Sequence, residues 1–101
     1  MRMIVKFQYP VEPFNSMVRD GSVGQVLGRI LEDLKPEAVY FAAGDGHRGG
    51  YMIMDVESAS DIPRIAEPFF LKFNALVEFI PCMTAEDLMR AGLDELGKKW
   101  G

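Results

Sequence analysis

Residues Gly50 to Met83 read GYMIMDVESASDIPRIAEPFFLKFNALVEFIPCM, and this stretch decides the fold. Its first part, Tyr51 to Glu57, alternates apolar and polar side chains with the period of two that is typical of a half-buried strand. Its last part, Lys72 to Pro81, alternates in the same way and is the clearest strand pattern in the chain. The stretch therefore predicts a strand, a short helix and a strand with almost no residues left over.

The helix between these two strands has a recognisable beginning and end. Ser58 to Asp61 supplies capping residues, and Pro63 falls in the first turn, where proline is tolerated. The apolar side chains continue as far as Phe70. Pro68 removes a backbone donor from the helix interior, so we expect it to cut the helix short.

The chain before this stretch repeats the same plan. Arg2 to Tyr9 alternates as a strand does, and a stripe of apolar residues at three- and four-residue steps then predicts a helix from Ser22 to Pro36. An earlier helix start, near Pro13 or Phe14, is a second interpretation of the same pattern.

A hairpin and a final helix complete the predicted elements. Ala38 to Ala43 is a short apolar run that predicts a strand, and four glycines among Gly44 to Gly50 favour a turn or flexible loop after it. At the other end, Thr84 is a suitable cap for a helix that runs to Trp100, with acidic residues at its start and basic residues at its end.

The order of these elements predicts the architecture. Strand, helix, strand, strand, helix, strand is the split βαβ pattern of ferredoxin-like α+β folds, here followed by a C-terminal helix. Right-handed crossovers give an antiparallel four-stranded sheet in the order 4-1-3-2. A chain of 101 residues has the common size of one domain, so residues 1–101 are expected to form a single domain.

Composition narrows the classes of function. A net charge of −4 offers no basic surface for phosphates, which disfavours nucleic-acid binding. No apolar run approaches the length that spans a bilayer, and Arg2 and Lys6 interrupt the first one, so we expect a cytoplasmic protein without a membrane partner. A single cysteine, Cys82, without a Cys or His partner at metal-ligand spacing predicts neither a disulfide nor a metal site. No cofactor is expected.

The two faces of the predicted sheet differ, and this difference predicts a dimer. One face is continuously apolar and would lie under the helices. The other face combines apolar with polar side chains: Ile4, Lys6, Gln8, Tyr51, Ile53, Asp55, Asn74, Leu76, Glu78 and Ile80. Its apolar members exceed the patch that a soluble monomer usually exposes. We therefore expect a homodimer in which two sheets face each other.

The segments GYMIMDVESASDI and PFFLKFNALVEFIPCM resemble the corresponding half of muconolactone isomerase and of related uncharacterised bacterial proteins in the dimeric α+β barrel superfamily. The resemblance covers the C-terminal half in its motifs and the whole chain only in element order. It implies a dimeric α/β barrel. Members of that superfamily include isomerases, cofactor-free monooxygenases, haem proteins like chlorite dismutase and proteins without known activity, and GDGHRGG has no clear counterpart in the isomerase active site.

Lys6 is the first candidate for a functional residue. We expect it on the central strand, between Asp55 on one neighbouring strand and Glu78 on the other, within the face that dimerisation would enclose. A partly buried lysine beside two carboxylates can hold an acidic substrate or supply a proton. The alternative is a structural ion-pair network without a ligand.

The glycine-rich loop carries the second candidate site. His47 is the only histidine and can exchange protons near neutral pH, while Arg48 can hold a carboxylate or a phosphate. The loop matches neither a P-loop nor a dinucleotide fingerprint. An exposed hairpin tip without a function explains the same residues. Tyr51 can add a hydroxyl to a pocket on the sheet, although a strand tyrosine more often packs its ring.

These residues support two main hypotheses of function. The first is a small homodimeric α+β barrel that binds a small organic acid or has a structural role. The alternative is a cofactor-independent isomerase or monooxygenase for a hydrophobic carboxylate, in which Lys6 or Arg48 holds the anion and His47 or Glu78 moves a proton. The enzyme needs a closed cavity between sheet and helices. A third possibility is an interaction domain whose final helix, with Trp100, docks onto another protein.

Overall fold

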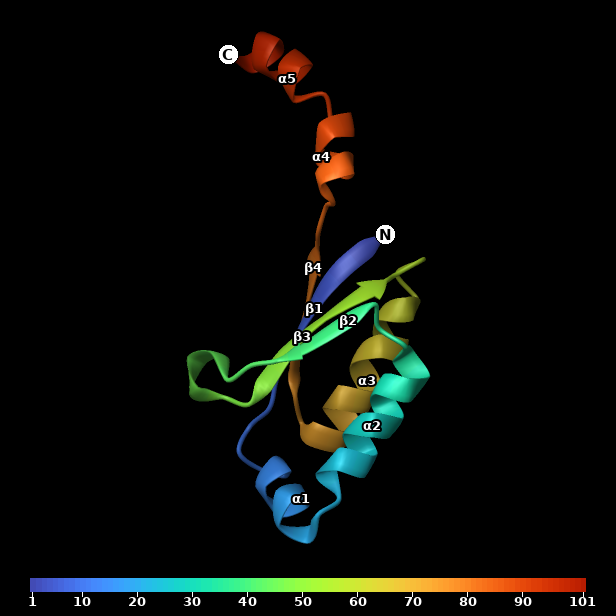
Figure 1. Ribbon diagram of the computed structural model, residues 1–101, viewed down its shortest axis with the longest axis vertical. Helices are drawn as coiled ribbons and strands as arrows, with labels where there is room; N and C mark the ends of the chain where they lie inside the picture. Colours follow the sequence, from blue (N-terminus) through green and yellow to red (C-terminus); the bar gives the residue numbers. More distant parts are fainter.

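The computed structural model describes all residues from Met1 to Gly101 (Figure 1). Its elements in chain order are β1 (Arg2–Gln8), α1 (Phe14–Asp20), α2 (Val23–Leu34), β2 (Ala38–Phe41), the 3-10 turn η1 (Gly44–Gly46), β3 (Gly49–Asp55), α3 (Asp61–Phe73), β4 (Leu76–Pro81), α4 (Ala85–Arg90) and α5 (Leu93–Trp100). The protein is thus a mixed α+β structure with the predicted alternation of strands and helices.

The four strands form one open antiparallel sheet in the order β2-β3-β1-β4. Counted from the β4 edge, this order reads 4-1-3-2, with β1 between β3 and β4 and β2 outside β3. Helices α2 and α3 lie together on one side of the sheet, and the β2–β3 loop projects beyond the ends of its two strands (Figure 1). The sheet therefore has one face that the helices cover and one that no helix covers, which we name the open face.

The core fills the space between the sheet and these two helices. Six side chains there are completely or almost completely inaccessible: Val5, Phe7, Met52, Ile65, Phe69 and Phe73. The ring of Phe7 stacks on that of Phe69 with 4.9 Å between centroids, so the central strand is fastened directly to α3. Burial of large aromatic side chains is the main source of stability in so small a domain.

The first helical segment differs from the predicted single helix. It is divided into α1 and α2 at Gly21, which has a φ of 81° in the left-handed region and caps α1. Phe14 at the start of α1 packs on Tyr9, with 4.8 Å between ring centroids. The earlier start at Phe14 is therefore correct for α1, while the helix predicted from Ser22 corresponds to α2.

Pro68 does not end α3, and this prediction was wrong. The helix continues to Phe73 and is capped by Asn74 in the left-handed conformation, so β4 begins at Leu76 instead of Lys72. Phe69 and Phe73 are both buried on the C-terminal side of the proline. Their burial outweighs the hydrogen bond that proline removes, which costs about 3 kcal/mol in a helix interior.

The predicted C-terminal helix is two helices that project from the body (Figure 1). Thr84 caps α4 as expected, in a capping box with Asp87, but Gly92 has a φ of 74° and separates α4 from α5. The molecule measures 60 × 27 × 19 Å, and its radius of gyration of 17.0 Å exceeds the roughly 13 Å of a compact domain of this length. None of the helices combines the length and apolar character needed to cross a membrane.

A change of Gly50 to Ala tests the close approach of strands in the sheet. A methyl group at Gly50 would meet the backbone carbonyl of Tyr40 and the ring of Phe7, neither of which can move freely. We expect Gly50→Ala to lower the free energy of unfolding by about 3 kcal/mol in urea denaturation. Gly28→Ala, in an exposed position of α2 with no atom within 4 Å of the added methyl, should instead raise it by ~0.5–1 kcal/mol. Equal effects of the two changes would contradict the strand packing.

Candidate functional site

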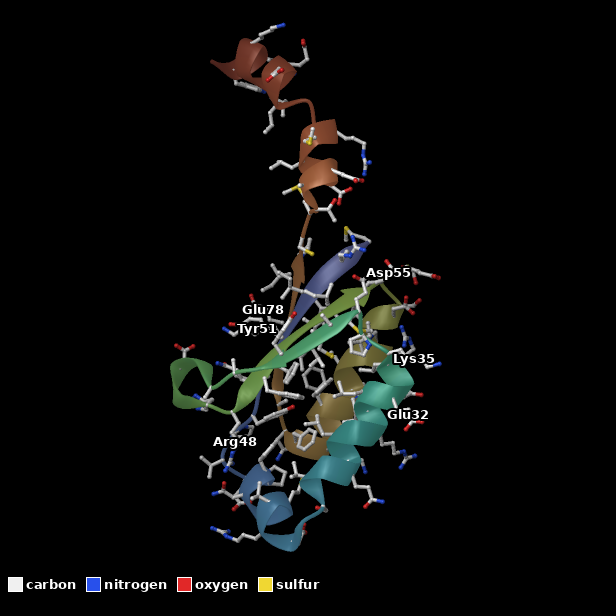
Figure 2. The ribbon with its side chains drawn as sticks, viewed as in Figure 1. Glu32, Lys35, Arg48, Tyr51, Asp55 and Glu78 are labelled. Carbon is white, nitrogen blue, oxygen red and sulfur yellow. The ribbon has the colours of Figure 1, made fainter.

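A row of four polar side chains crosses the open face. Tyr40 is paired with Tyr51, Tyr51 with Lys6, and Lys6 with Glu78. Directly opposed residues of an antiparallel pair point to the same face, so these four side chains lie side by side across β2, β3, β1 and β4. Figure 2 shows Tyr51 and Glu78 near each other on this side of the sheet. We name this set the polar row.

An apolar row lies next to the polar row. Two residues further along each strand, the register aligns four side chains in the same way: Ala38, Ile53, Ile4 and Ile80. All four are only half-buried in the single chain. The open face therefore has an apolar half and a polar half, and the predicted membership of Ile4, Ile53 and Ile80 in this face is correct.

Asp55 does not lie beside Lys6, and this half of the prediction was wrong. The partner of Asp55 on β1 is Arg2, and its carboxylate accepts a hydrogen bond from the N-terminal amine of Met1 at 3.1 Å. Asp55 is four positions beyond Tyr51 on β3, roughly 13 Å along the strand at about 3.4 Å per residue. The alternation of side chains predicted the face correctly, but it did not fix the register of the two strands.

Lys6 lines a hollow at the β4 edge of the open face and has no ion-pair partner. The hollow has a volume of about 370 Å³ and is lined by Lys6, Gln8, Phe70, Leu76, Val77 and Glu78. All seven ion pairs of the structure are formed by other residues. The predicted neighbourhood of Lys6 and Glu78 is confirmed, yet their charges are not within 4.0 Å of each other. The ammonium group of Lys6 is thus free to meet another anion.

Arg48 fastens the glycine-rich loop to α1 and does not face the polar row. Its guanidinium donates a hydrogen bond to Asn15 Oδ1 at 2.7 Å and lies over the ring of Phe14, 4.8 Å from the centroid. Its carbonyl accepts a hydrogen bond from Tyr9 N at 2.8 Å. In Figure 2, Arg48 is near α1, away from Tyr51 and Glu78. These contacts give Arg48 a structural role.

His47 is exposed and interacts within its own loop. Its Nδ1 atom lies 3.0 Å from the carbonyl oxygen of Asp45. The loop itself is held to the open face by Gln8, whose side-chain amide donates to the carbonyl of Gly44 at 3.3 Å. The described contacts of His47 therefore include no other residue of the predicted site.

The space between the sheet and the helices holds a packed core with one polar atom that lacks a partner. The Tyr9 hydroxyl is buried without a hydrogen bond, while the ring packs between Phe14 and Phe73 at 4.8 Å from each. Burial raises the pKa of Tyr9 above its usual value of 10.0, because the charged phenolate is poorly solvated there. This hydroxyl is a feature that the sequence pattern did not predict.

A second, larger hollow lies between α2 and α3 on the outside of the molecule. It has a volume of about 970 Å³, and charges of both signs line it: Arg29, Glu32, Asp33, Lys35, Arg64, Glu67 and Lys72. Glu32 and Lys35 lie on the side of α2 that is remote from the sheet (Figure 2). Because charges of both signs line it, this hollow favours no ligand of a particular charge. In the sequence, only the polar side of α2, opposite its apolar stripe, indicated this hollow.

No protein-family model matches the chain, and a search of curated proteins finds none that matches it. The resemblance to the muconolactone isomerase family, based on the segments within residues 50–83, therefore stays a prediction.

Replacement of Tyr9 by Phe tests the unpartnered hydroxyl. A buried hydroxyl without a hydrogen bond destabilises the folded state, so we expect Tyr9→Phe to raise the free energy of unfolding by about 1 kcal/mol. Tyr40→Phe, at a tyrosine whose side chain is 69% exposed, should change it by less than about 0.5 kcal/mol. A loss of stability in Tyr9→Phe would show that the hydroxyl has a partner.

The same variant should also change the response to alkaline pH. The folded-state pKa of Tyr9 is raised, so the free energy of unfolding is independent of this group below pH 10.0. It falls as the pH rises further, because the unfolded chain then releases the proton more readily than the folded one. Chemical denaturation across this range should show a smaller loss of stability for Tyr9→Phe.

Proposed function

We propose that the protein is a homodimeric α+β barrel in which the open faces of two sheets pack together, and that it binds a small organic acid through Lys6. The observation that carries this proposal is an unpaired lysine in a hollow of a partly apolar face. The apolar row supplies the contact surface, and the polar row supplies the groups that recognise a ligand.

The amount of exposed apolar surface supports the dimer. Tyr40 and Leu76 are 69% and 72% exposed on the open face, and the four half-buried side chains of the apolar row add to this surface. Sheets that pack face to face are about 10 Å apart, so a second sheet would remove most of these side chains from water. Burial of apolar surface stabilises such an interface by about 25 cal/mol per Å² before the cost of association.

The position of Lys6 supports an acidic ligand. A second sheet over the open face would take its ammonium group out of bulk water, and a charge in such a place needs an anion beside it. Glu78 is the nearest acid in the register, and it supplies one candidate partner. A ligand carboxylate supplies the other, and the hydroxyl of Tyr51 on the opposite side of Lys6 can donate a hydrogen bond to it.

We propose that the protein binds the acid, and we do not propose that it catalyses a reaction of the acid. The isomerase or monooxygenase alternative needs a group that transfers a proton beside the bound acid. His47 hydrogen-bonds within its loop, and Arg48 is engaged with α1, so Glu78 is the one predicted catalytic residue within the polar row. No specific observation favours the enzymatic alternative.

Two leucines of almost equal exposure test the proposed dimer interface. Leu76 lies on the open face and is 72% exposed, whereas Leu71 lies on α3 beside the outer hollow and is 77% exposed. We expect Leu76→Glu to weaken dimerisation at least tenfold, because it buries a charge in the interface, and Leu71→Glu to leave it within about twofold. Sedimentation equilibrium gives both dissociation constants. A monomeric wild-type protein at high concentration would contradict the dimer.

A thermal-shift screen of short-chain and aromatic carboxylic acids tests the ligand. At tenfold excess over its dissociation constant, a bound acid stabilises the protein by about 1.4 kcal/mol and raises Tm by about 6 °C. We expect Lys6→Met to abolish this shift.

Lys72→Met is the matched control, because Lys72 lines the outer hollow between α2 and α3. It should leave the shift unchanged. A shift that disappears only in Lys72→Met would move the site to the outer hollow. A wild-type protein that responds to no acid, together with a less stable Lys6→Met variant, would favour the structural ion pair with Glu78.

A further inference from the structure

The last part of the chain has no partner in its own molecule. Residues 82–101, which we name the C-terminal arm, continue beyond β4 as α4 and α5 and project away from the sheet and the other helices (Figure 1). Neither helix contains a buried residue. The arm is the main reason that the molecule is 60 Å long and only 19 Å thick.

The arm nevertheless has an apolar face. Leu93, Leu96 and Trp100 follow each other at steps of three and four, which places them on one side of α5. They are 56%, 45% and 76% exposed, and on α4 Leu88 and Met89 are exposed as well. Lys98 and Asp94 are on the other sides of α5. A stripe of this kind is typical of a helix that packs against apolar surface.

The helices of the arm are too short to be stable in water alone. α4 has six residues and α5 has eight, whereas isolated helices below about 12–15 residues are marginal even in favourable sequences. The capping box of Thr84 and Asp87 stabilises the start of α4 by only about 1 kcal/mol. The helical form of the arm therefore indicates a packed state, in which another surface covers the stripe.

The accessible surface of the chain exceeds that of a compact monomer by more than one partner buries in a standard protein interface. The accessible area is 6953 Å², while a compact monomer of 11.3 kDa exposes roughly 5,700 Å². The excess of roughly 1,200 Å² is somewhat more than the about 800 Å² that each partner buries in a standard protein interface. An interface that included the arm would account for the excess.

The arm leaves the body in a direction that takes it away from its own open face. Cys82 N donates to Arg2 O at 3.4 Å, so the chain still follows the edge of β1 after β4 has ended. Thr84 is extended, with φ of −78° and ψ of 167°, and α4 continues in the line of β4 (Figure 1). An arm with this direction does not fold back on its own sheet, so its apolar stripe stays available to a second copy (Figure 1).

We infer that the C-terminal arm docks on a second copy of this chain, so that two copies exchange their arms across the proposed dimer. The inference rests on the proposed dimer for the presence of the second copy, and it adds that the arm forms part of the interface. The exposed area favours the same occupant, because the excess of roughly 1,200 Å² is enough for the share that each partner buries in a stable dimer. In a dimer with two-fold symmetry, each docking contact occurs twice.

Trp100 is the only tryptophan and reports directly on the docking of the arm. In the separate chain it is 76% exposed, so dilution of the wild-type protein should shift its fluorescence emission to the red and increase quenching by acrylamide. The midpoint of this change should coincide with the dissociation constant of the dimer from sedimentation.

Two substitutions to the same residue on opposite sides of α5 make the test specific. Leu96→Glu puts a charge into the apolar stripe, and we expect it to raise the dissociation constant of the dimer at least tenfold and to leave Trp100 with red emission. Lys98→Glu lies on the other side of the helix and should change the constant by less than about threefold. Both positions are exposed in the single chain, so circular dichroism should show a folded body in both variants.

The other outcomes overturn the inference in distinguishable ways. Blue emission at every concentration from a monomer places the arm on its own body. A dimer whose Trp100 emission is red throughout, and which Leu96→Glu does not weaken, has no docked arm but leaves the dimer of facing sheets in place. A wild-type protein that is monomeric with red emission removes both the arm exchange and the proposed dimer.

Discussion

The contact of Phe7 with Gly50 and Phe69 is the constraint on which the rest of the structure depends. Phe7 is fully buried on the central strand, stacks on Phe69 of α3 and is paired across the sheet with Gly50, where a side chain would meet its ring. This fit allows one register of β1 and β3 only. A shift by two residues would keep every side chain on its face but would place a methionine side chain at Met52 where Phe7 requires a glycine. The positions of Lys6 and Tyr51 follow from that register.

The sequence predicted the faces of the sheet better than the neighbours within a face. Alternation along Arg2–Tyr9 and Tyr51–Glu57 identified which side chains point to the open face, because the period of two is a local property. The pairing of Lys6 with Tyr51, and of Asp55 with Arg2, depends on long-range packing at Phe7. The predicted triad of Lys6, Asp55 and Glu78 was therefore half right, since β4 had the expected register and β3 did not.

The ends of the helices also depended on long-range packing that local sequence patterns do not contain. Pro68 and Gly92 have similar local effects, since each lowers the helix propensity of its segment. Pro68 is followed by Phe69 and Phe73, whose burial holds α3 together, whereas no residue near Gly92 is buried and the helix breaks there. Where tertiary contacts are absent, local propensity determines whether a helix continues. Where they are present, packing determines it. The division of the C-terminal segment thus also indicates that this segment lacks contacts within its own chain.

The open face and the arm lead to a link between ligand binding and assembly. In the proposed dimer, Lys6 is desolvated only when the second copy is present, so an anion beside Lys6 relieves a cost that dimerisation itself creates. A ligand that binds the dimer more tightly than the monomer must strengthen dimerisation by the same factor, because the coupling free energy is reciprocal. The arm would contribute to this coupling without touching the ligand, since it stabilises the assembled state alone. On this proposal, the lysine without a counterion and the half-apolar face have one explanation: an interface that needs both the second copy and the acid.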